Sequence, residues 1–298
     1  MTISFEISQS YPTRDQSDLE ILDPSRVRAL HRLFDRSDDD FDLDGGLCIL
    51  DHWVYFWNDF PTSLIGDDGH EVVGDFLREY NFANPRRMYA GGEIRSLEKL
   101  EFNTQTRMVS KIEEVVNKNG RSGAMVFVTI RHEIFQSERL CRTESQRLVY
   151  LEGPSNATYP EIVNIGAHYL PRALIDYGEV SEQGDLRAHM IASASALFRF
   201  SALTYNSHRI HLDRQYCQEV DHYPGLVVHG PLLAMAALEV ISRMDPSRQL
   251  RSFDFRAHAP VFEGESVELC AKNVNDDNVE VHLFKGDLGV MVVNGQYF

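Results

Sequence analysis

Strand-like alternation of apolar and polar positions dominates two stretches of the chain. From Arg87 to about residue 151, runs rich in β-branched and aromatic residues alternate with polar ones, and Asn119-Gly120 separates two of these runs. Asn-Gly between β-type runs is a strong hairpin signal, because both central residues must accept a positive φ. The pattern therefore predicts an antiparallel sheet over residues 87–151.

One segment near the C-terminus has the pattern of a buried helix. Within PLLAMAALEVISRM at 231–244, only Glu239, Ser242 and Arg243 interrupt the apolar residues. A helix that is apolar around most of its circumference must be enclosed by other elements. Four strand-like runs follow it, so we predict an α+β layer in which an antiparallel sheet curls around this helix.

The first half contains no comparably apolar helix. Residues 24–34 form an amphipathic helical pattern, whereas 51–60 and 71–80 are weaker helical candidates, and the acidic run at 37–44 is expected to be a solvated loop. Residues 152–195 are rich in Gly, Pro, Ser and Asn, which is typical of a connection. We therefore divide the chain into an N-terminal half at 1–151, a linker at 152–195 and a C-terminal half at 196–298, with a strand from Leu197.

Composition and charge indicate which classes of partner the protein is suited to bind and in which compartment it is expected. The 298 residues carry a formal net charge of −16, which argues against nucleic-acid binding because that binding depends on Lys and Arg neutralising phosphates. The four cysteines form no CxxC pair, which favours a reducing compartment. No signal peptide and no membrane-spanning apolar run is visible. We expect a cytoplasmic protein, with the mitochondrial matrix as the alternative.

A polar loop and the start of the apolar helix hold the residues best suited to chemistry. Asn206, His208 and His211 lie in the loop, and His229 precedes Gly230 at the start of the helix. Hydration of an enoyl thioester needs a proton acceptor, a proton donor for the α-carbon and donors for the thioester oxygen. Histidine can take the first role at neutral pH. The free N–H groups and positive dipole of a helix start suit the last one, and glycine permits close approach.

Two other interpretations compete with this one. A loop histidine is more often a structural residue than a catalytic one. A metal site is the other competitor, with ligands from His208, His211, Asp213 and His229, but HxxH in a loop is weaker evidence than two histidines one helical turn apart. We expect no metal.

Several blocks of the sequence are similar to one enzyme family. They are FRFSALTYNSHRIHLDRQY at 198–216, YPGLVVHGPLLA at 223–234, FRAHAPVFEGE at 255–265, RRMYAGGEI at 86–94 and KNGRSGAMVFVTIRHEI at 118–134. In these blocks the chain resembles the MaoC-like double-hotdog hydratases, in the branch of mesaconyl-C4-CoA hydratases and mitochondrial 3-hydroxyacyl-thioester dehydratases. The resemblance implies two hotdog halves, each a sheet curling towards a helix, with catalysis in the C-terminal half and a reduced or atypical helix in the N-terminal half.

The resemblance also implies roles for particular residues. The catalytic aspartate and histidine of R-specific enoyl-CoA hydratases, five positions apart, fall on Asn206 and His211, so His211 would carry acid–base chemistry and Asn206 would orient water. Gly230 would polarise the thioester carbonyl. His208 would have a supporting role, and we add His229 as a further candidate for substrate binding. Five arginines are either solvated surface charges or ligands of coenzyme A phosphates or of a second substrate carboxylate, namely Arg86, Arg87, Arg209, Arg214 and Arg256.

The activity implied is reversible hydration of an α,β-unsaturated acyl thioester, with a branched C5 dicarboxylic acyl-CoA such as mesaconyl-C4-CoA as one candidate. Three alternatives stay open: a 3-hydroxyacyl-ACP dehydratase, a hotdog thioesterase and a non-catalytic thioester-binding protein. No cofactor is expected beyond the coenzyme A or acyl-carrier pantetheine of the substrate itself. A homodimer is also left open.

Overall fold

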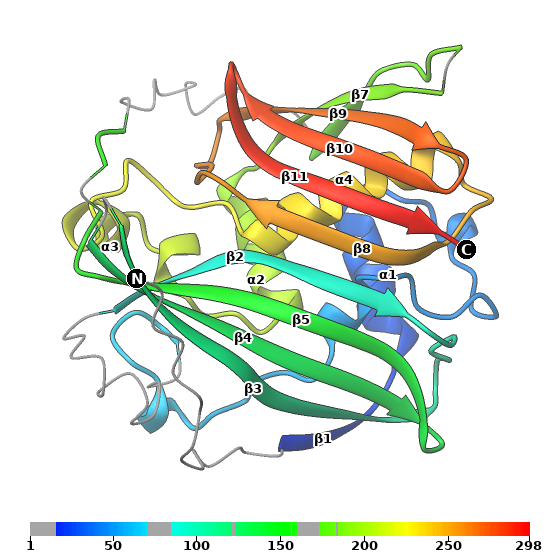
Figure 1. Cartoon of the computed structure of the whole chain (residues 1–298), viewed down its shortest axis with the longest axis horizontal. Helices are drawn as coiled ribbons and strands as arrows, with labels where there is room; N and C mark the ends of the chain where they lie inside the picture. The colour runs from blue at the N-terminus through cyan, green and yellow to red at the C-terminus, as the bar shows by residue number, and fades with distance from the viewer. Residues whose placement is uncertain (1–15, 71–84, 121–122, 156, 160–172, 183) are drawn as a thin grey trace.

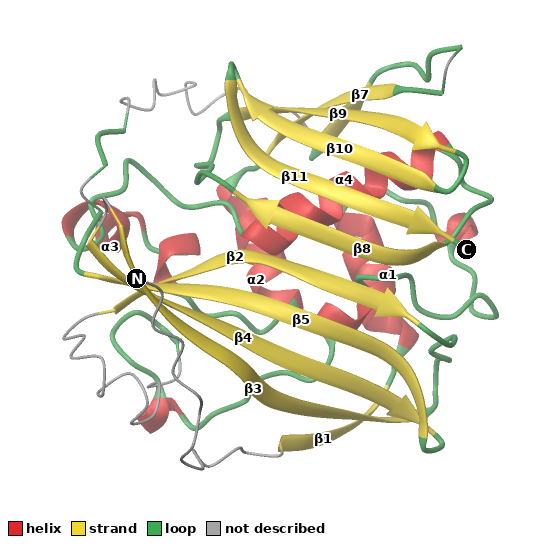
Figure 2. Cartoon of the chain, viewed as in Figure 1, coloured by secondary structure: helices red, strands yellow, loops and turns green. Residues whose placement is uncertain are grey.

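The computed structural model describes residues 16–70, 85–120, 123–155, 157–159, 173–182 and 184–298. Eleven strands form one antiparallel sheet in the order β1-β3-β4-β5-β2-β8-β11-β10-β9-β7-β6 (Figures 1 and 2). Their bounds are β1 Gln16–Ile21, β2 Pro85–Ser96, β3 Gln105–Gly120, β4 Gly123–Gln136, β5 Arg139–Glu152, β6 Ile175–Tyr177, β7 Leu186–Ile191, β8 Leu250–Ala257, β9 Ser266–Asn275, β10 Asn278–Lys285 and β11 Leu288–Tyr297.

The sheets of the two halves are joined edge to edge. Strand β2 pairs with β5 on one side and with β8 on the other, so the two sheets predicted from sequence are continuous. At the junction Gly91 has a φ of +152°, and a Cβ there would lie 2.3 Å from the carbonyl oxygen of Phe255. Glycine is therefore required where the two halves meet.

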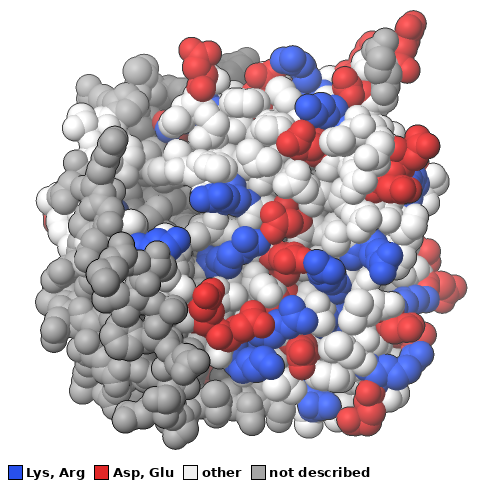
Figure 3. Space-filling view, in the orientation of Figure 1, with Lys and Arg blue, Asp and Glu red and all other residues white. Residues whose placement is uncertain are grey.

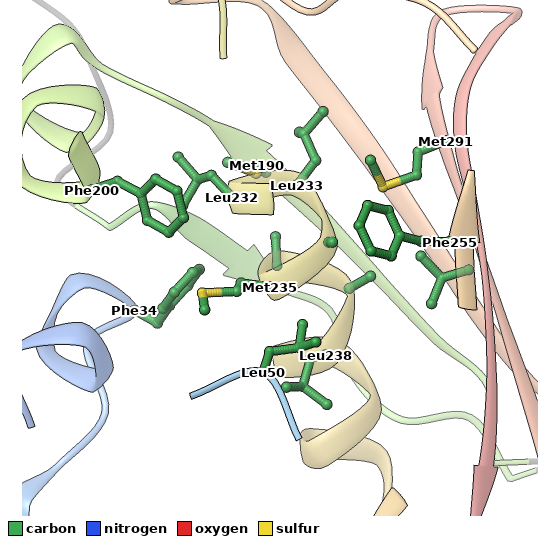
Figure 4. Close-up of a cluster of buried hydrophobic side chains, with 14 of the residues drawn as sticks. Phe34, Leu50, Met190, Phe200, Leu232, Leu233, Met235, Leu238, Phe255 and Met291 are labelled. Atoms are coloured by element: carbon green, nitrogen blue, oxygen red, sulfur yellow. The ribbon is translucent and has the colours of Figure 1, made fainter. Parts of the chain in front are cut away.

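Helix α4, Gly230–Met244, is the central helix of the C-terminal half, as predicted. Ten of its residues are buried, and it packs against β7, β9, β10 and β11 as well as β2. Figure 4 shows Leu233 of the helix towards Phe255 and Met291 of the sheet, while Phe200 and Phe34 cover the other side. The continuous apolar surface of the helix is thus enclosed on all sides, which stabilises it mainly through hydrophobic burial.

Among the described residues of the N-terminal half, the one α-helix is short. Helix α1, Pro24–Leu33, matches the predicted amphipathic helix, with the Asp23 side chain accepting the Ser25 N–H and Pro24 in the first turn. The predicted helix at 51–60 is a single 3-10 turn, η2 Asp51–Val54, and the candidate at 71–80 lies outside the described residues. Two further short turns are η1 Asp38–Asp40, inside the acidic run, and η3 Thr62–Leu64.

The strand predicted from Leu197 is wrong. Residues Ala194–Leu203 form helix α2, with the Ser193 side chain accepting the N–H of Ala196 at the start. The apolar alternation in FRFSAL resembles a strand, but Ala196, Leu197 and Phe200 bury one face at helical spacing. This face is buried against α1 and other elements of the fold, and that burial stabilises the helix over the strand.

Two further predictions need revision. The stretch 152–195 contains β6 and β7, and β7 pairs with β9, burying Leu186, Ala188 and Met190. The C-terminal sheet therefore begins inside the expected linker. The hairpin between β3 and β4 is present, but Asn119 and Gly120 are paired with Ala124 and Gly123, so the connection falls at 121–122, outside the described residues.

The outer face of the sheet carries mixed charge. In Figure 3, Lys and Arg side chains are interspersed with Asp and Glu over the strands, so the negative net charge is not concentrated on this face. Among the described residues, none of the helices has both the length and the apolar character needed to cross a bilayer.

Candidate active site

A cavity of about 800 Å³ lies between the two halves of the chain. The start of α4 and the loop after α2 line it from the C-terminal half, and β2, β4 and β5 line it from the N-terminal half. Asn206, His208, His211, His229 and Gly230 all border this one cavity. Residues predicted from a polar loop and a distant helix start are therefore brought together.

The tautomer of His211 is fixed by the backbone. His211 ends a single 3-10 turn, η5 Arg209–His211, and its Nδ1 lies 2.7 Å from the carbonyl oxygen of Val227. A carbonyl oxygen can only accept, so Nδ1 carries the proton. In the neutral ring, Nε2 then has a free lone pair, which is the form that a general base needs.

His229 lies face to face with His211. The two ring centroids are 3.5 Å apart and the planes make an angle of 20°. His229 Nε2 is 2.9 Å from the Ser201 hydroxyl of α2, while its buried Nδ1 has no hydrogen-bond partner within the described chain. Because His229 is the residue just before α4, this stacking places His211 beside Gly230, the first residue of the helix.

Two more groups complete the polar side of the cavity. The Asn206 carboxamide oxygen accepts the backbone N–H of His208 at 3.0 Å, which holds the loop in a tight turn. His70, from the N-terminal half, packs its ring against His208 with centroids 4.2 Å apart. His70 carried no recognisable sequence signal, because it lies in a loop more than a hundred residues before the others.

Burial keeps these imidazoles neutral. It lowers the pKa of His211 to about 4, against the opposing effect of its hydrogen bond to Val227. Burial also places the pKa values of His70, His208 and His229 well below the usual range for histidine, and the neighbouring imidazoles or Arg87 add to the effect. At neutral pH the cluster is therefore uncharged, and each imidazole keeps an unprotonated nitrogen that can act as an acceptor.

Gly230 occupies the start of α4, where backbone N–H groups have no partner within the helix. A Cβ built at this position would lie 3.5 Å from the Cβ of Tyr89, which is an ordinary van der Waals contact. The surrounding protein therefore leaves room for a methyl group, and the glycine keeps the cavity open at the helix start.

The opposite wall carries a carboxylate that sequence reasoning missed. Glu144 of β5 is buried and accepts hydrogen bonds from His52 Nε2 at 2.7 Å, Trp53 Nε1 at 3.1 Å and the Tyr89 hydroxyl at 3.2 Å. Burial opposes ionisation, but the hydrogen bond from His52 and the other donors lower the pKa of Glu144 to about 2. This wall of the cavity is therefore charged.

Cross-strand register extends this polar wall. Ser110, His132 and Glu144 are paired directly across β3, β4 and β5. His132 Nδ1 lies 2.7 Å from the Ser110 hydroxyl, and Gln146 lies beside them on the cavity. A row of polar side chains thus crosses three adjacent strands, beside apolar lining residues of the same strands such as Met108, Met125 and Phe127.

The five candidate arginines divide into two groups. Arg87 and Arg256 line the cavity, and Arg256 is exposed. The other three do not line it. Arg86 donates to the Gly153 carbonyl and the Tyr223 hydroxyl, Arg209 pairs with Asp213, and Arg214 pairs with Glu263.

The four candidate metal ligands of the histidine loop and helix start do not form one ligand set, because Asp213 is engaged elsewhere. Asp213 accepts the N–H of Tyr216 at the start of helix α3, Arg214–Glu219, and forms a salt bridge with Arg209. Its carboxylate is therefore engaged away from the three imidazoles.

Comparison with known proteins shows the family to which the chain belongs. The sequence model of the family described as hydroxyacyl-thioester dehydratase type 2 matches residues 50–263. Mesaconyl-C(4)-CoA hydratase of Chloroflexus aurantiacus is 37% identical over 238 residues, which cover 80% of this chain and 79% of that protein. The mitochondrial hydroxyacyl-thioester dehydratase type 2 of Schizosaccharomyces pombe is 24% identical over 263 residues, covering 80% of this chain and 81% of that protein.

Solved structures agree on the fold. A MaoC-like dehydratase superposes with a TM-score of 0.67 at 12% identity, over 94% of this chain and 95% of that chain. A Mycobacterium tuberculosis protein described as a double hotdog gives 0.54 at 13% identity, over 95% of each chain. The double-hotdog fold predicted from sequence is confirmed. The chain belongs to the hydroxyacyl-thioester dehydratase type 2 family and is a hydro-lyase.

Proposed function

We propose that the chain adds water reversibly to the double bond of a short, branched dicarboxylic enoyl-CoA, of which mesaconyl-C4-CoA is the example. The observation that carries this proposal is the stacking of His211 on His229, beside Gly230. It puts a neutral base next to free N–H groups at a helix start, so water activation and thioester polarisation can occur on one substrate.

In the proposed hydration, His211 Nε2 takes a proton from water that the Asn206 carboxamide holds. The resulting hydroxide adds to the β-carbon, and the backbone N–H of Gly230 stabilises the negative charge that develops on the thioester oxygen. The α-carbon then takes up a proton, which balances the one removed from water. Dehydration follows the same steps in reverse.

The cavity lining supports a polar acyl group. Arg87 lines the same cavity as His208, and its positive charge contributes to lowering the pKa of that imidazole, which supports a position near the reacting end of the cavity. A guanidinium matches a carboxylate bidentately, and a carboxylate on the β-carbon would fall beside His211. The polar row of Ser110, His132 and Glu144 disfavours a long saturated chain at the opposite wall.

The carrier is proposed to be coenzyme A. Arg256 and His258 are exposed residues at the end of β8 and border the cavity, where they can meet the phosphates of an entering cofactor moiety. The protein is proposed to act in the cytoplasm, with acyl carrier protein and the mitochondrial matrix as the alternatives.

The test is an assay of purified protein with mesaconyl-C4-CoA, crotonyl-CoA and a long trans-2-enoyl-CoA. Loss of enoyl absorbance without release of thiol is expected, and fastest with mesaconyl-C4-CoA. His211→Ala is expected to lower kcat by about 10²–10⁴-fold, the usual contribution of a general base. His189→Ala, on the exposed face of β7, is the matched control. Thiol release without hydration would identify a thioesterase, and unchanged turnover in His211→Ala would refute the assignment.

A further inference from the structure

A second cluster of coordinating side chains lies away from the cavity, where α1 meets the segment before η2. It consists of His31, Cys48 and Asp51, none of which borders the cavity. One ligand atom from each of the three lies within 4.8 Å of the other two. We propose that these residues form a structural binding site for a divalent transition-metal ion with the preferences of zinc.

The strongest observation is the state of His31. The residue is only 8% exposed, its Nδ1 has no hydrogen-bond partner within the described part of the chain, and its Nε2 has only a long contact of 3.5 Å with the carboxylate of Asp51. A buried imidazole nitrogen without a partner is costly, since it loses water and gains no hydrogen bond in return. Its ring packs edge-on against Phe41, which aims Nε2 at the carboxylate of Asp51.

The separation between His31 and Asp51 suits coordination better than hydrogen bonding. His31 Nε2 lies 3.5 Å from Asp51 Oδ1, which is long for a hydrogen bond. Ligand bonds of about 2.0–2.3 Å in tetrahedral geometry place two ligand atoms about 3.3–3.7 Å apart. The distance from imidazole to carboxylate therefore already matches a shared ion.

The backbone preorganises the other two ligands. Asp51 Oδ2 accepts the N–H of Cys48 at 2.9 Å, and the other carboxylate oxygen, Oδ1, faces His31 and lies close to the thiol. Asp51 is buried, and Cys48 is exposed as a residue although burial raises the pKa of its thiol to about 12. An ion that approaches beside Cys48 therefore has to displace the thiol proton, and water can complete the coordination. Thiolate, imidazole and carboxylate together are a ligand set that favours zinc.

Nearby charges do not prevent binding. Arg36 and Arg142 approach the cluster, but Arg36 forms an ion pair with Glu239 at 2.6 Å. Arg142 is engaged by the carbonyl oxygens of Leu47 and Cys48. On binding, the thiol of Cys48 would lose its proton to solvent and coordinate as thiolate, while Asp51 adds the second negative charge.

The site would connect α1 to the segment that leads into His52 and Trp53, the residues that hold Glu144 on the cavity wall. Its role is to stabilise that segment. No step of the proposed hydration uses the ion, and the binding test does not depend on activity.

Cobalt(II) is the probe for the first experiment. Untagged protein stripped with a chelator and titrated with Co²⁺ is expected to show a thiolate-to-cobalt charge-transfer band that saturates at one ion per chain. Cys48→Ala removes the band, and so does His31→Phe, which keeps the aromatic contact with Phe41. Cys270→Ala, the free thiol on β9, is the matched control and keeps it. A band that is missing in the wild type, or that survives Cys48→Ala, would overturn the proposal.

Alkylation of the wild type gives a second readout that needs no variant. With zinc at ten times its dissociation constant, modification of Cys48 by iodoacetamide, followed by peptide mass spectrometry, is expected to slow by about tenfold. Modification of Cys270 in the same sample should be unchanged. Equal rates for Cys48 with and without zinc would contradict a shared metal site.

Discussion

The imidazole rings of His211 and His229 are stacked with their centroids 3.5 Å apart, and a backbone carbonyl fixes the proton of His211 on Nδ1. A positive charge on either ring would face the other ring in a site with little water. Both rings are therefore held neutral at physiological pH. The behaviour of the site towards protons follows from this contact.

The pH dependence of hydration should reflect the burial of His211. Because burial lowers the pKa of this imidazole to about 4, the base form persists far below the usual histidine range. We expect kcat/KM for hydration to be flat from about pH 8 down to about pH 5 and to fall only below that, whereas an ordinary histidine would lose activity near ~6.5. Stopped assays between these limits measure the profile, and a midpoint near 6.5 would point to a different base.

The same burial should make folding sensitive to acid. The pKa of His229 is well below its unfolded value, so below about pH 6.5 the unfolded chain takes up a proton that the folded chain does not. Stability is therefore present above that pH and is lost as the pH falls. His229→Gln keeps an acceptor for Ser201 and is expected to reduce the slope of unfolding free energy against pH by about 1.4 kcal/mol per pH unit near pH 5.

Urea unfolding at several pH values measures this slope. His189→Gln, on the exposed face of β7, is the matched control and should leave the slope as in the wild type. Burial raises the pKa of Asp221 to about 6, which gives that carboxyl the opposite sign, so the comparison between variants is more informative than the total slope. Equal slopes for His229→Gln and the wild type would show that His229 titrates normally in the folded protein.

Gly230→Ala separates folding from catalysis. The added Cβ meets Tyr89 at an ordinary 3.5 Å, and alanine suits a helix better than glycine, so the melting temperature should be unchanged or slightly raised. The methyl group would displace the thioester from the helix start, and a shift of about 1 Å in a reacting group costs about 10²-fold in rate. A variant that is both stable and fully active would remove Gly230 from the proposed oxyanion site.

Arg87→Met tests the substrate carboxylate. Loss of one charge-assisted hydrogen-bonding partner costs about 1.5–3 kcal/mol, so kcat/KM for mesaconyl-C4-CoA should fall by about 10–100-fold. Crotonyl-CoA lacks the second carboxylate and should be affected much less. Arg214→Met, whose guanidinium pairs with Glu263 outside the cavity, is the control. Equal losses with both substrates would assign Arg87 to coenzyme A or to folding.

Much of the fold followed from local pattern. The apolar helix α4, the helix α1 and the strands β2–β5 and β8–β11 were predicted because periodicity over many residues leaves few alternatives, whereas β1, β6 and β7 were not predicted. Helix α2 was predicted as a strand, since FRFSAL fits both periods and only its contacts with α1 and the core decide between them. The merging of two sheets into one depends on the β2–β8 edge pairing, which local pattern does not encode.

The candidate site also has features that were predicted from the sequence and features that only the structure shows. The sequence by itself predicted Asn206, His211 and Gly230 as the residues suited to hydration, because their residue types and the family resemblance are both visible along the chain. Only the tertiary structure decided that His229 stacks on His211, that His70 and Glu144 join the same cavity, and that Arg87 rather than Arg209 lines it. Burial and long-range contacts set these relationships, and they exist only once β2, β5 and the start of α4 are packed together.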